Sequence, residues 1–253
     1  MNITIILLFF IYGTILGSFY NVVGLRVPKG TLFQQQRSYC DTCERTLSWT
    51  ELIPIFSYLF QGGRCKTCRE KISPIYPIME FLTGFLFAYS FYRFGWSHLT
   101  ILGVLLTSLI IPITVSDIAY QKIPNKILLF FTPLFMIYRF IYPLTPWWDS
   151  ILGALIAFTL VFLIIVISKG GMGMGDLKYY TLFGLIFGTK YFFLLFFLST
   201  LYGVVIGVIK MKVEGTGGKT RIAFGPFIGL AALTVFFFGS QIINWYLKSV
   251  LLT

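Results

Sequence analysis

The sequence predicts an all-α, polytopic membrane protein with about eight transmembrane helices and a small polar domain between the first two. Three observations predict this class. The 253 residues are 57% hydrophobic and only 11% charged, whereas soluble proteins are roughly 25% charged. Several apolar runs of about twenty residues are each long enough to cross roughly 30 Å of hydrocarbon. Runs such as 101–115 are apolar on every side, which disfavours the alternating pattern of a membrane β-barrel.

Apolar segments divide the chain into a first transmembrane helix at 1–23, a polar domain at 24–76 and a seven-helix membrane domain at 77–253. The sixth candidate span is only a dozen residues long, and Gly188, Thr189 and Lys190 predict a turn after it. The eight predicted spans are 3–23, 77–94, 101–115, 126–142, 151–167, 177–188, 191–209 and 223–247.

The positions of the basic residues predict the topology. No basic residue precedes the first span, and Arg26 and Lys29 follow it, which places the N-terminus outside. The net charge of +11 therefore indicates topology and contact with anionic membrane lipid, and not binding of nucleic acid. With eight crossings, the only basic residues on outer segments are Arg93, Arg139, Lys190 and Lys248.

All four cysteines lie in the polar domain, as Cys40-Asp-Thr-Cys43 and Cys65-Lys-Thr-Cys68. Each C-x2-C turn can supply two thiolates, and two such turns can close a tetrahedron around Zn²⁺. A segment of about fifty residues with few apolar side chains needs such a metal site to stabilise its fold. The alternatives are two disulfides or four unrelated thiols, and the reducing cytoplasm disfavours disulfides. Four thiolates leave no open coordination position, so the predicted zinc is structural.

Three acidic residues, Glu80, Asp117 and Asp176, lie within or at the mouths of apolar spans. An ionisable group is costly there and is a functional candidate. Asp117 ends the third span and Asp176 opens the sixth, so both face the cytoplasm by the parity of crossings. Two carboxyl groups at one depth lose their protons in separate steps, as an aspartyl protease requires. The alternatives are a hydrogen-bonding residue at a span end for Asp117 and a helix cap for Asp176.

Two other functional classes compete with a protease. A secondary transporter would use Asp117 and Asp176 as a proton or cation relay, although the sequence lacks a second copy of the glycine-rich break that internal repeats would give. A membrane scaffold would dock partners through the cysteine domain, which leaves both aspartates unexplained. The single histidine, His98, lies on an outer segment and excludes Ser-His-Asp and HExxH chemistry.

Further motifs extend along most of the chain, and their order is that of one known family. In these motifs the chain resembles the type IV prepilin peptidases, the leader peptidases and N-methyltransferases of pilins, pseudopilins and competence pilins. The motifs are Gly17-Ser-Phe-Tyr-Asn21, Arg37-Ser-x-Cys40, Leu47-x-Trp49-x-x-Leu52-Ile-Pro54, Ile72-Ser73-Pro74-x-Tyr76-Pro77-x-x-Glu80, Asp117 seven residues before Pro124, Gly173-x-Gly175-Asp176 and Phe224-Gly225-Pro226-Phe227.

The resemblance implies that Asp117 and Asp176 are the catalytic aspartates of a GxGD intramembrane aspartyl protease and that the four cysteines bind zinc. It implies cleavage of a short basic leader after a glycine, at the cytoplasmic face of the bacterial inner membrane, with a type IV prepilin or pseudopilin as substrate. It also implies methylation of the new N-terminus from S-adenosylmethionine, a role associated with the first cytoplasmic domain. Glu80 and Asn21 are the candidate residues for that second reaction.

Overall fold

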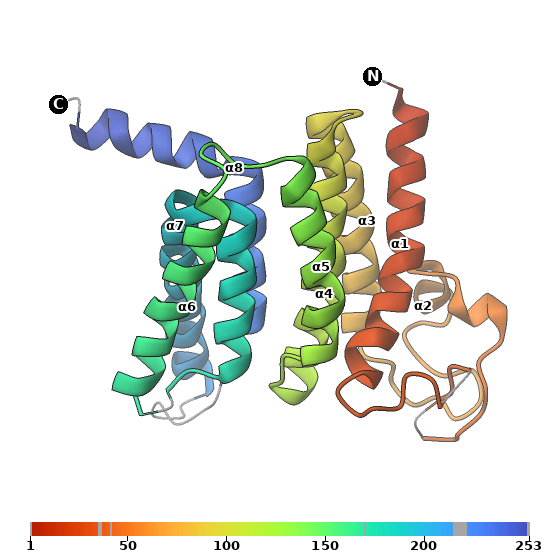
Figure 1. Cartoon of the computed structure of the whole chain (residues 1–253). Coiled ribbons are helices and arrows are strands. Elements are labelled where there is room, and N and C mark those ends of the chain that lie inside the picture. Colours follow the sequence, from red (N-terminus) through yellow and green to blue (C-terminus); the bar gives the residue numbers. More distant parts are fainter. Residues whose placement is uncertain (1, 35–36, 41, 170, 215–221, 252–253) are drawn as a thin grey trace. The chain divides into compact units, whose positions relative to one another are not determined.

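The computed structural model of the chain is built from helices, and it describes residues 2–34, 37–40, 42–169, 171–214 and 222–251. The chain divides into two units, Met1–Ala119 and Tyr120–Thr253, and each is described by itself (Figure 1). Within the described ranges, β pairing is limited to two isolated bridges in the cysteine segment. Asp41, between Cys40 and Cys43, lies outside the described ranges.

The first unit contains three long helices, α1 (Ile3–Arg26), α3 (Ile75–Phe94) and α4 (His98–Tyr120), with η1 (Trp49–Leu52) and α2 (Phe56–Phe60) between α1 and α3. Helices α1 and α3 approach closely through small residues, because a Cβ atom on Gly13 would lie 2.7 Å from the Cα atom of Gly84. The Tyr20 hydroxyl donates to Ser108 Oγ at 2.6 Å. That hydrogen bond connects α1 to α4.

The C-terminal parts of α1 and α4 lie at the same end of the first unit. A Cβ atom on Gly24 would lie 2.7 Å from both the Pro112 carbonyl oxygen and the Val115 Cβ atom. The cysteine segment leaves α1 at this end and returns to the start of α3. Asp117 lies three residues before the end of α4, so this end of the unit carries both the cysteine segment and Asp117.

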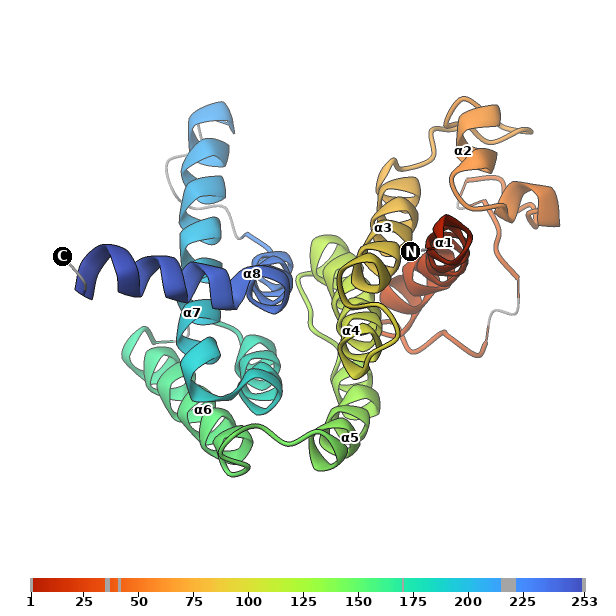
Figure 2. The ribbon, with the colours of Figure 1, turned by 90° about the horizontal axis from the view of Figure 1, so that it is seen from above.

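The second unit contains α5 (Asn125–Ile141), α6 (Asp149–Ile167), α7 (Met174–Glu214) and α8 (Gly225–Leu251). The chain reverses direction within α7 at Gly188, where φ is 73° and ψ is 178° (Figure 2). The hydroxyl oxygens of Tyr180 and Ser199 lie 2.6 Å apart, although nineteen residues of unbroken helix would separate them by about 28 Å. The predicted turn at 188–190 is therefore confirmed, and α7 is a hairpin of two helices.

All eight predicted spans are helical, which confirms the polytopic all-α class. Five of the described helices, α1, α4, α6, α7 and α8, are long and apolar enough to cross a membrane. Helices α1, α4, α6 and α8 each correspond to one predicted span, and the two helices of the α7 hairpin correspond to two. The remaining two predicted spans are α3 and the 17-residue α5. Helix boundaries differ from those predicted: the span predicted at 101–115 is α4, which continues to Tyr120 and so includes Asp117.

Candidate functional site

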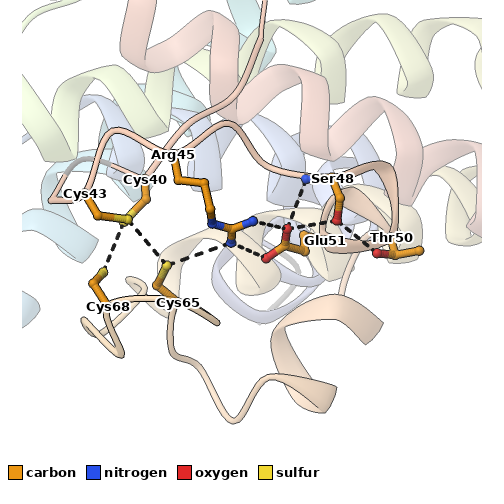
Figure 3. A network of polar contacts seen from close by, with 8 residues as sticks. All are labelled: Cys40, Cys43, Arg45, Ser48, Thr50, Glu51, Cys65 and Cys68. Atoms are coloured by element: carbon orange, nitrogen blue, oxygen red, sulfur yellow. Dashed lines mark hydrogen bonds and ion pairs between the residues drawn. The ribbon is translucent and has the colours of Figure 1, made fainter.

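The four cysteine thiols form one cluster in which all the sulfur atoms lie within 4.8 Å of one another. Cys40 Sγ lies 3.6 Å from Cys68 Sγ, and Cys43 Sγ lies 4.0 Å from Cys65 Sγ (Figure 3). All four are free thiols, so these pairs are not disulfides. A tetrahedral site with Zn–S bonds of roughly 2.3 Å has sulfur–sulfur edges of about 3.8 Å. The cluster therefore has the dimensions needed to hold a metal ion.

The two C-x2-C pairs are flanked by the same backbone contacts. In each turn the N–H of the first cysteine donates to the carbonyl oxygen five residues later at 2.9 Å, and an isolated β-bridge closes the loop. The residue after the second cysteine, Glu44 or Arg69, has a positive φ of 54° or 59°. This repeated turn brings the two thiols of each pair to the same side. The two bridges join Tyr39 with Thr46 and Arg64 with Lys71.

The ionisation of the thiols indicates that the cluster is suited to a cation. Backbone N–H groups of Cys68 and Thr67 stabilise the Cys65 thiolate and lower the pKa of Cys65 to about 6. The Glu70 N–H acts in the same direction on Cys68, but desolvation and the neighbouring thiols outweigh it and raise the pKa of Cys68 to about 12. Neighbouring thiolates repel one another, so they do not ionise together. A divalent cation removes this repulsion and deprotonates the thiols.

An ion pair between Arg45 and Glu51 lies beside the cysteines, and sequence reasoning did not identify it. The Arg45 guanidinium donates to both Glu51 carboxylate oxygens at 2.9 and 2.7 Å, and its Nη2 atom lies 4.0 Å from Cys65 Sγ (Figure 3). The Arg45 side chain and the Ser48 N–H lower the pKa of Glu51 to about 2. The available signal was Ser48-x-x-Glu51, which has capping-box spacing and forms that box at η1.

Glu80 and Asn21 lie where α1 and α3 meet the cysteine segment. Glu80 Oε2 accepts a hydrogen bond from the Ile55 N–H at 2.7 Å, and Ile55 has a positive φ of 63° immediately before α2. Asn21 Nδ2 donates to the Tyr76 carbonyl oxygen at 3.1 Å. Asn21 Oδ1 is buried, and among the described residues it has no hydrogen-bond partner. Both residues therefore tie backbone segments together, and Asn21 retains an acceptor.

Asp117 belongs to the first unit and lies in the last turn of α4. Its side chain is only 5% exposed, and Ser116 beside it is fully buried. The helix ends at Tyr120, and Gln121 then has a positive φ of 52°. An acidic residue is thus buried in a helix of high hydropathy, close to the point where the chain leaves that helix.

Asp176 belongs to the second unit and is the third residue of α7. Its Oδ2 atom accepts a hydrogen bond from the Gly173 N–H at 3.1 Å, which is the reciprocal half of a capping box. A Cβ atom on Gly175 would lie 2.9 Å from the Ile123 Cβ atom, and Lys178 Nζ donates to Asn125 Oδ1 at 2.9 Å. The first turn of α7 therefore packs against the start of α5. The alternative of a capping role for Asp176 has direct geometric support.

Comparison with known proteins defines the class of this membrane protein. Residues 11–94 match the bacterial peptidase A24 N-terminal domain, and residues 104–208 match the type IV leader peptidase family. The chain belongs to this family, and the resemblance carried by the sequence motifs is confirmed. It is therefore a multi-pass membrane protein of a peptidase family.

Several relatives that match over most of their length are named prepilin leader peptidase/N-methyltransferase. The protein from Bacillus subtilis (strain 168) is 39% identical, over 96% of this chain and 98% of the relative. The protein from Neisseria gonorrhoeae is 30% identical, over 94% of this chain and 93% of the relative. The protein from Legionella pneumophila is 29% identical, over 83% of this chain and 75% of the relative. No solved structure matches the chain.

Proposed function

We propose that this protein is an intramembrane aspartyl endopeptidase that removes the leader peptide of type IV prepilins or pseudopilins and then methylates the new N-terminus. The observation that carries this proposal is a 39% identity with a prepilin leader peptidase/N-methyltransferase over 96% of the chain. The transporter alternative has no support from any of the relatives. The proposed location is the bacterial inner membrane, with the N-terminus outside and the cysteine segment in the cytoplasm.

The proposed catalytic residues are Asp117 and Asp176. Hydrolysis of a peptide bond by two aspartates requires one ionised carboxylate, which takes a proton from the attacking water, and one protonated carboxyl group, which donates to the carbonyl oxygen. The burial of Asp117 in an apolar helix supports its assignment, because an ionisable group is costly there and is therefore a functional candidate. The close approach of Gly175 to Ile123 holds the first turn of α7, which carries Asp176, against the chain just before α5.

The cleavage test uses the full-length protein reconstituted with a candidate prepilin, and mass spectrometry of the prepilin N-terminus as the readout. Asp117→Asn and Asp176→Asn are each expected to reduce cleavage to below about 1% of wild type, because an amide cannot exchange the required proton. Asp149→Asn, at the start of α6, is the matched control and is expected to cleave normally. Cleavage of more than a few per cent in either catalytic variant would rule out this pair.

The proposed methylation follows cleavage, because only cleavage frees the amine that is methylated. S-adenosylmethionine would supply the methyl group when bound. Glu80 and Asn21 are the residues proposed to hold the cationic amine or the sulfonium of the methyl donor. The buried acceptor Asn21 Oδ1 and the Glu80 carboxylate fit a positively charged donor. The bond from Glu80 to the Ile55 N–H supports a structural role as well, so the two roles need separate variants.

Glu80→Gln and Glu80→Leu separate these roles. Glutamine keeps an oxygen that can accept from the Ile55 N–H but loses the charge, and it is expected to give cleaved, unmethylated product. Leucine removes the acceptor too, and it is expected to loosen the segment around α2, measured as faster hydrogen exchange at residues 53–60. Full N-methylation in Glu80→Gln would show that the charge has no part in the transfer.

The proposed metal of the cysteine cluster is Zn²⁺, held by Cys40, Cys43, Cys65 and Cys68. Thiolate ligands in a closed tetrahedron suit zinc, and no ligand position remains for a reacting water. Metal analysis of the purified protein should therefore find about one zinc per chain. A protein without metal and with two disulfides would contradict both the metal and the cytoplasmic location.

A further inference from the structure

Helix α2 exposes an apolar strip, defined here as Phe56, Leu59 and Phe60. The exposed fractions of these three side chains are 59%, 65% and 88%, and the Phe56 and Phe60 rings stack with centroids 6.5 Å apart. In the preceding stretch Trp49 is exposed as well. Apolar groups gathered on a polar domain in this way mark a surface that contacts another phase or molecule.

The fold of the cysteine segment fixes the outward direction of the α2 strip. Tyr58, on the other side of the helix, packs against the second cysteine turn, where a Cβ atom on Gly63 would lie 2.8 Å from the Tyr58 hydroxyl oxygen. The Gly63 N–H also donates to the Tyr58 carbonyl oxygen at 2.9 Å. One side of α2 is therefore occupied by its own domain, and the α2 strip faces away from it.

The height of α2 along the membrane helices follows from the Glu80–Ile55 hydrogen bond of 2.7 Å. Glu80 is five residues into α3, which is about 7 Å along the helix axis. Since Ile55 immediately precedes α2, α2 begins beside the first turns of α3 and not beyond its end. In Figure 1 α2 likewise lies at the height of the lower part of α1.

The surroundings of α2 are those of a membrane interface. On α3, Ile78 and Phe81 are exposed within two residues of Glu80, so exposed apolar side chains of α3 lie at a height similar to that of the α2 strip. Arg64 and Lys71 are exposed and share an open pocket of about 420 Å³ with Pro74, the residue before α3. Basic side chains attract anionic headgroups, and aromatic side chains favour the headgroup–acyl boundary.

We propose that the α2 strip inserts into the headgroup–acyl boundary of the leaflet on the side of the cysteine segment, and that Arg64 and Lys71 bind anionic lipid headgroups there. Lipid is the occupant because the strip lies at the height of exposed apolar side chains of α3 and belongs to a segment with exposed basic side chains at Arg64 and Lys71. This anchor would hold the cysteine segment flat against the membrane. The proposal does not depend on the catalytic assignment.

The test places a benzoylphenylalanine at residue 60, or at the exposed control residue Thr42 between Cys40 and Cys43, in the full-length metal-loaded protein. Each variant is reconstituted in nanodiscs of phosphatidylethanolamine and phosphatidylglycerol, irradiated and analysed by intact mass spectrometry. Residue 60 is expected to give at least about tenfold more lipid adduct than residue 42. Equal adduct at the two positions would overturn the proposal, as would crosslinking of residue 60 to a second copy or a co-reconstituted prepilin in place of lipid.

A second arm tests the headgroup charge. With the photoreactive group at residue 60, Arg64→Gln with Lys71→Gln is expected to lower the lipid adduct at least about threefold in phosphatidylglycerol nanodiscs and to leave it unchanged in phosphatidylcholine. The matched control, Lys66→Gln with Arg69→Gln, removes the same charge from the second cysteine turn and is expected to have no effect. An equal loss in the control, or no loss in either, would overturn the assignment of anionic lipid to Arg64 and Lys71.

Discussion

The cysteine segment and the α6–α7 helix pair are stabilised by different kinds of interaction. Among the described residues of 27–74, only Glu51 and Cys65 are buried, so this segment has no apolar core. In the α6–α7 pair, by contrast, the fully buried side chains of Tyr179, Tyr180 and Phe183 pack inside the second unit. The segment relies on a few polar bonds and on the proposed metal site, whereas the helix pair relies on close packing.

Because of this difference, the two regions should respond to different changes. A structure held by a few strong bonds fails when one centre is removed, because no packed interior remains to hold it. The stability of a closely packed helix pair does not depend on metal, so a chelator should not change it. Added side-chain volume should lower its stability, since neighbouring backbones already touch. Loss of the metal ligands and added volume between the helices should therefore affect different regions.

Removal of the proposed metal should have the largest effect, and only on the cysteine segment. Binding of structural zinc supplies about 10–16 kcal/mol of apparent folding free energy in zinc-finger peptides. We expect Cys65→Ser, or a strong chelator, to abolish metal binding and to open residues 27–74 to proteolysis and hydrogen exchange. Exchange in α6 and α7 should not change. Equal protection of residues 27–74 with and without metal would contradict this dependence.

Added volume should have the next largest effect, and only on the helix pair. A Cβ atom on Gly153 would lie 2.5 Å from the Gly184 carbonyl oxygen, so the two backbones must separate. We expect Gly153→Val to destabilise the second unit by about 1–3 kcal/mol, measured by thermal unfolding in detergent. Thr159→Val, on an exposed position of α6, is the matched control. Metal content should be that of wild type in both variants.

The sequence predicted the features that depend on local spacing and hydropathy. Apolar runs predict helices directly, and the φ of 73° at Gly188 is one that glycine adopts without strain, so the turn at 188–190 was readable. The clustering of the four cysteines could be predicted because C-x2-C spacing places two thiols on the same turn. Burial of Asp117 was expected from its place at the end of an apolar span.

The sequence did not reveal hydrogen bonds and ion pairs that depend on how the chain runs between helices. Arg45 lies six residues before Glu51 and Glu80 lies 25 residues after Ile55, and no periodic pattern links either pair. The end of α4 was also placed too early, because polar residues such as Ser116 and Asp117 interrupt the apolar run without ending the helix. A buried helix tolerates such residues wherever packing surrounds them, which hydropathy alone does not show.

Loss of Arg45 should weaken the cysteine segment less than loss of a cysteine. Its guanidinium bridges Glu51 and Cys65, so it orients the cluster although it is not one of the proposed metal ligands. We expect Arg45→Met to lower zinc affinity about 10–100-fold, as is typical for residues that support metal ligands, measured by chelator competition. Arg37→Met, at an exposed position, should leave the affinity unchanged. Wild-type affinity in Arg45→Met would show that the ion pair stabilises only η1.

The smallest effect is expected where a polar bond supports the packed helix pair. Asp149 Oδ1 accepts a hydrogen bond from the Thr189 N–H at 3.2 Å, immediately after the break at Gly188, so it caps the second helix of the α7 hairpin. Asparagine keeps an oxygen for this bond and loses only the charge near two helix N-termini, which is worth about 0.3–1 kcal/mol. Leucine also removes the cap, which costs about 1 kcal/mol more. We therefore expect the unfolding free energy to fall in the order wild type, Asp149→Asn, Asp149→Leu, with the loss in Asp149→Asn smaller than that in Gly153→Val. Equal losses in the two Asp149 variants would mean that the charge, and not the hydrogen bond, stabilises the hairpin.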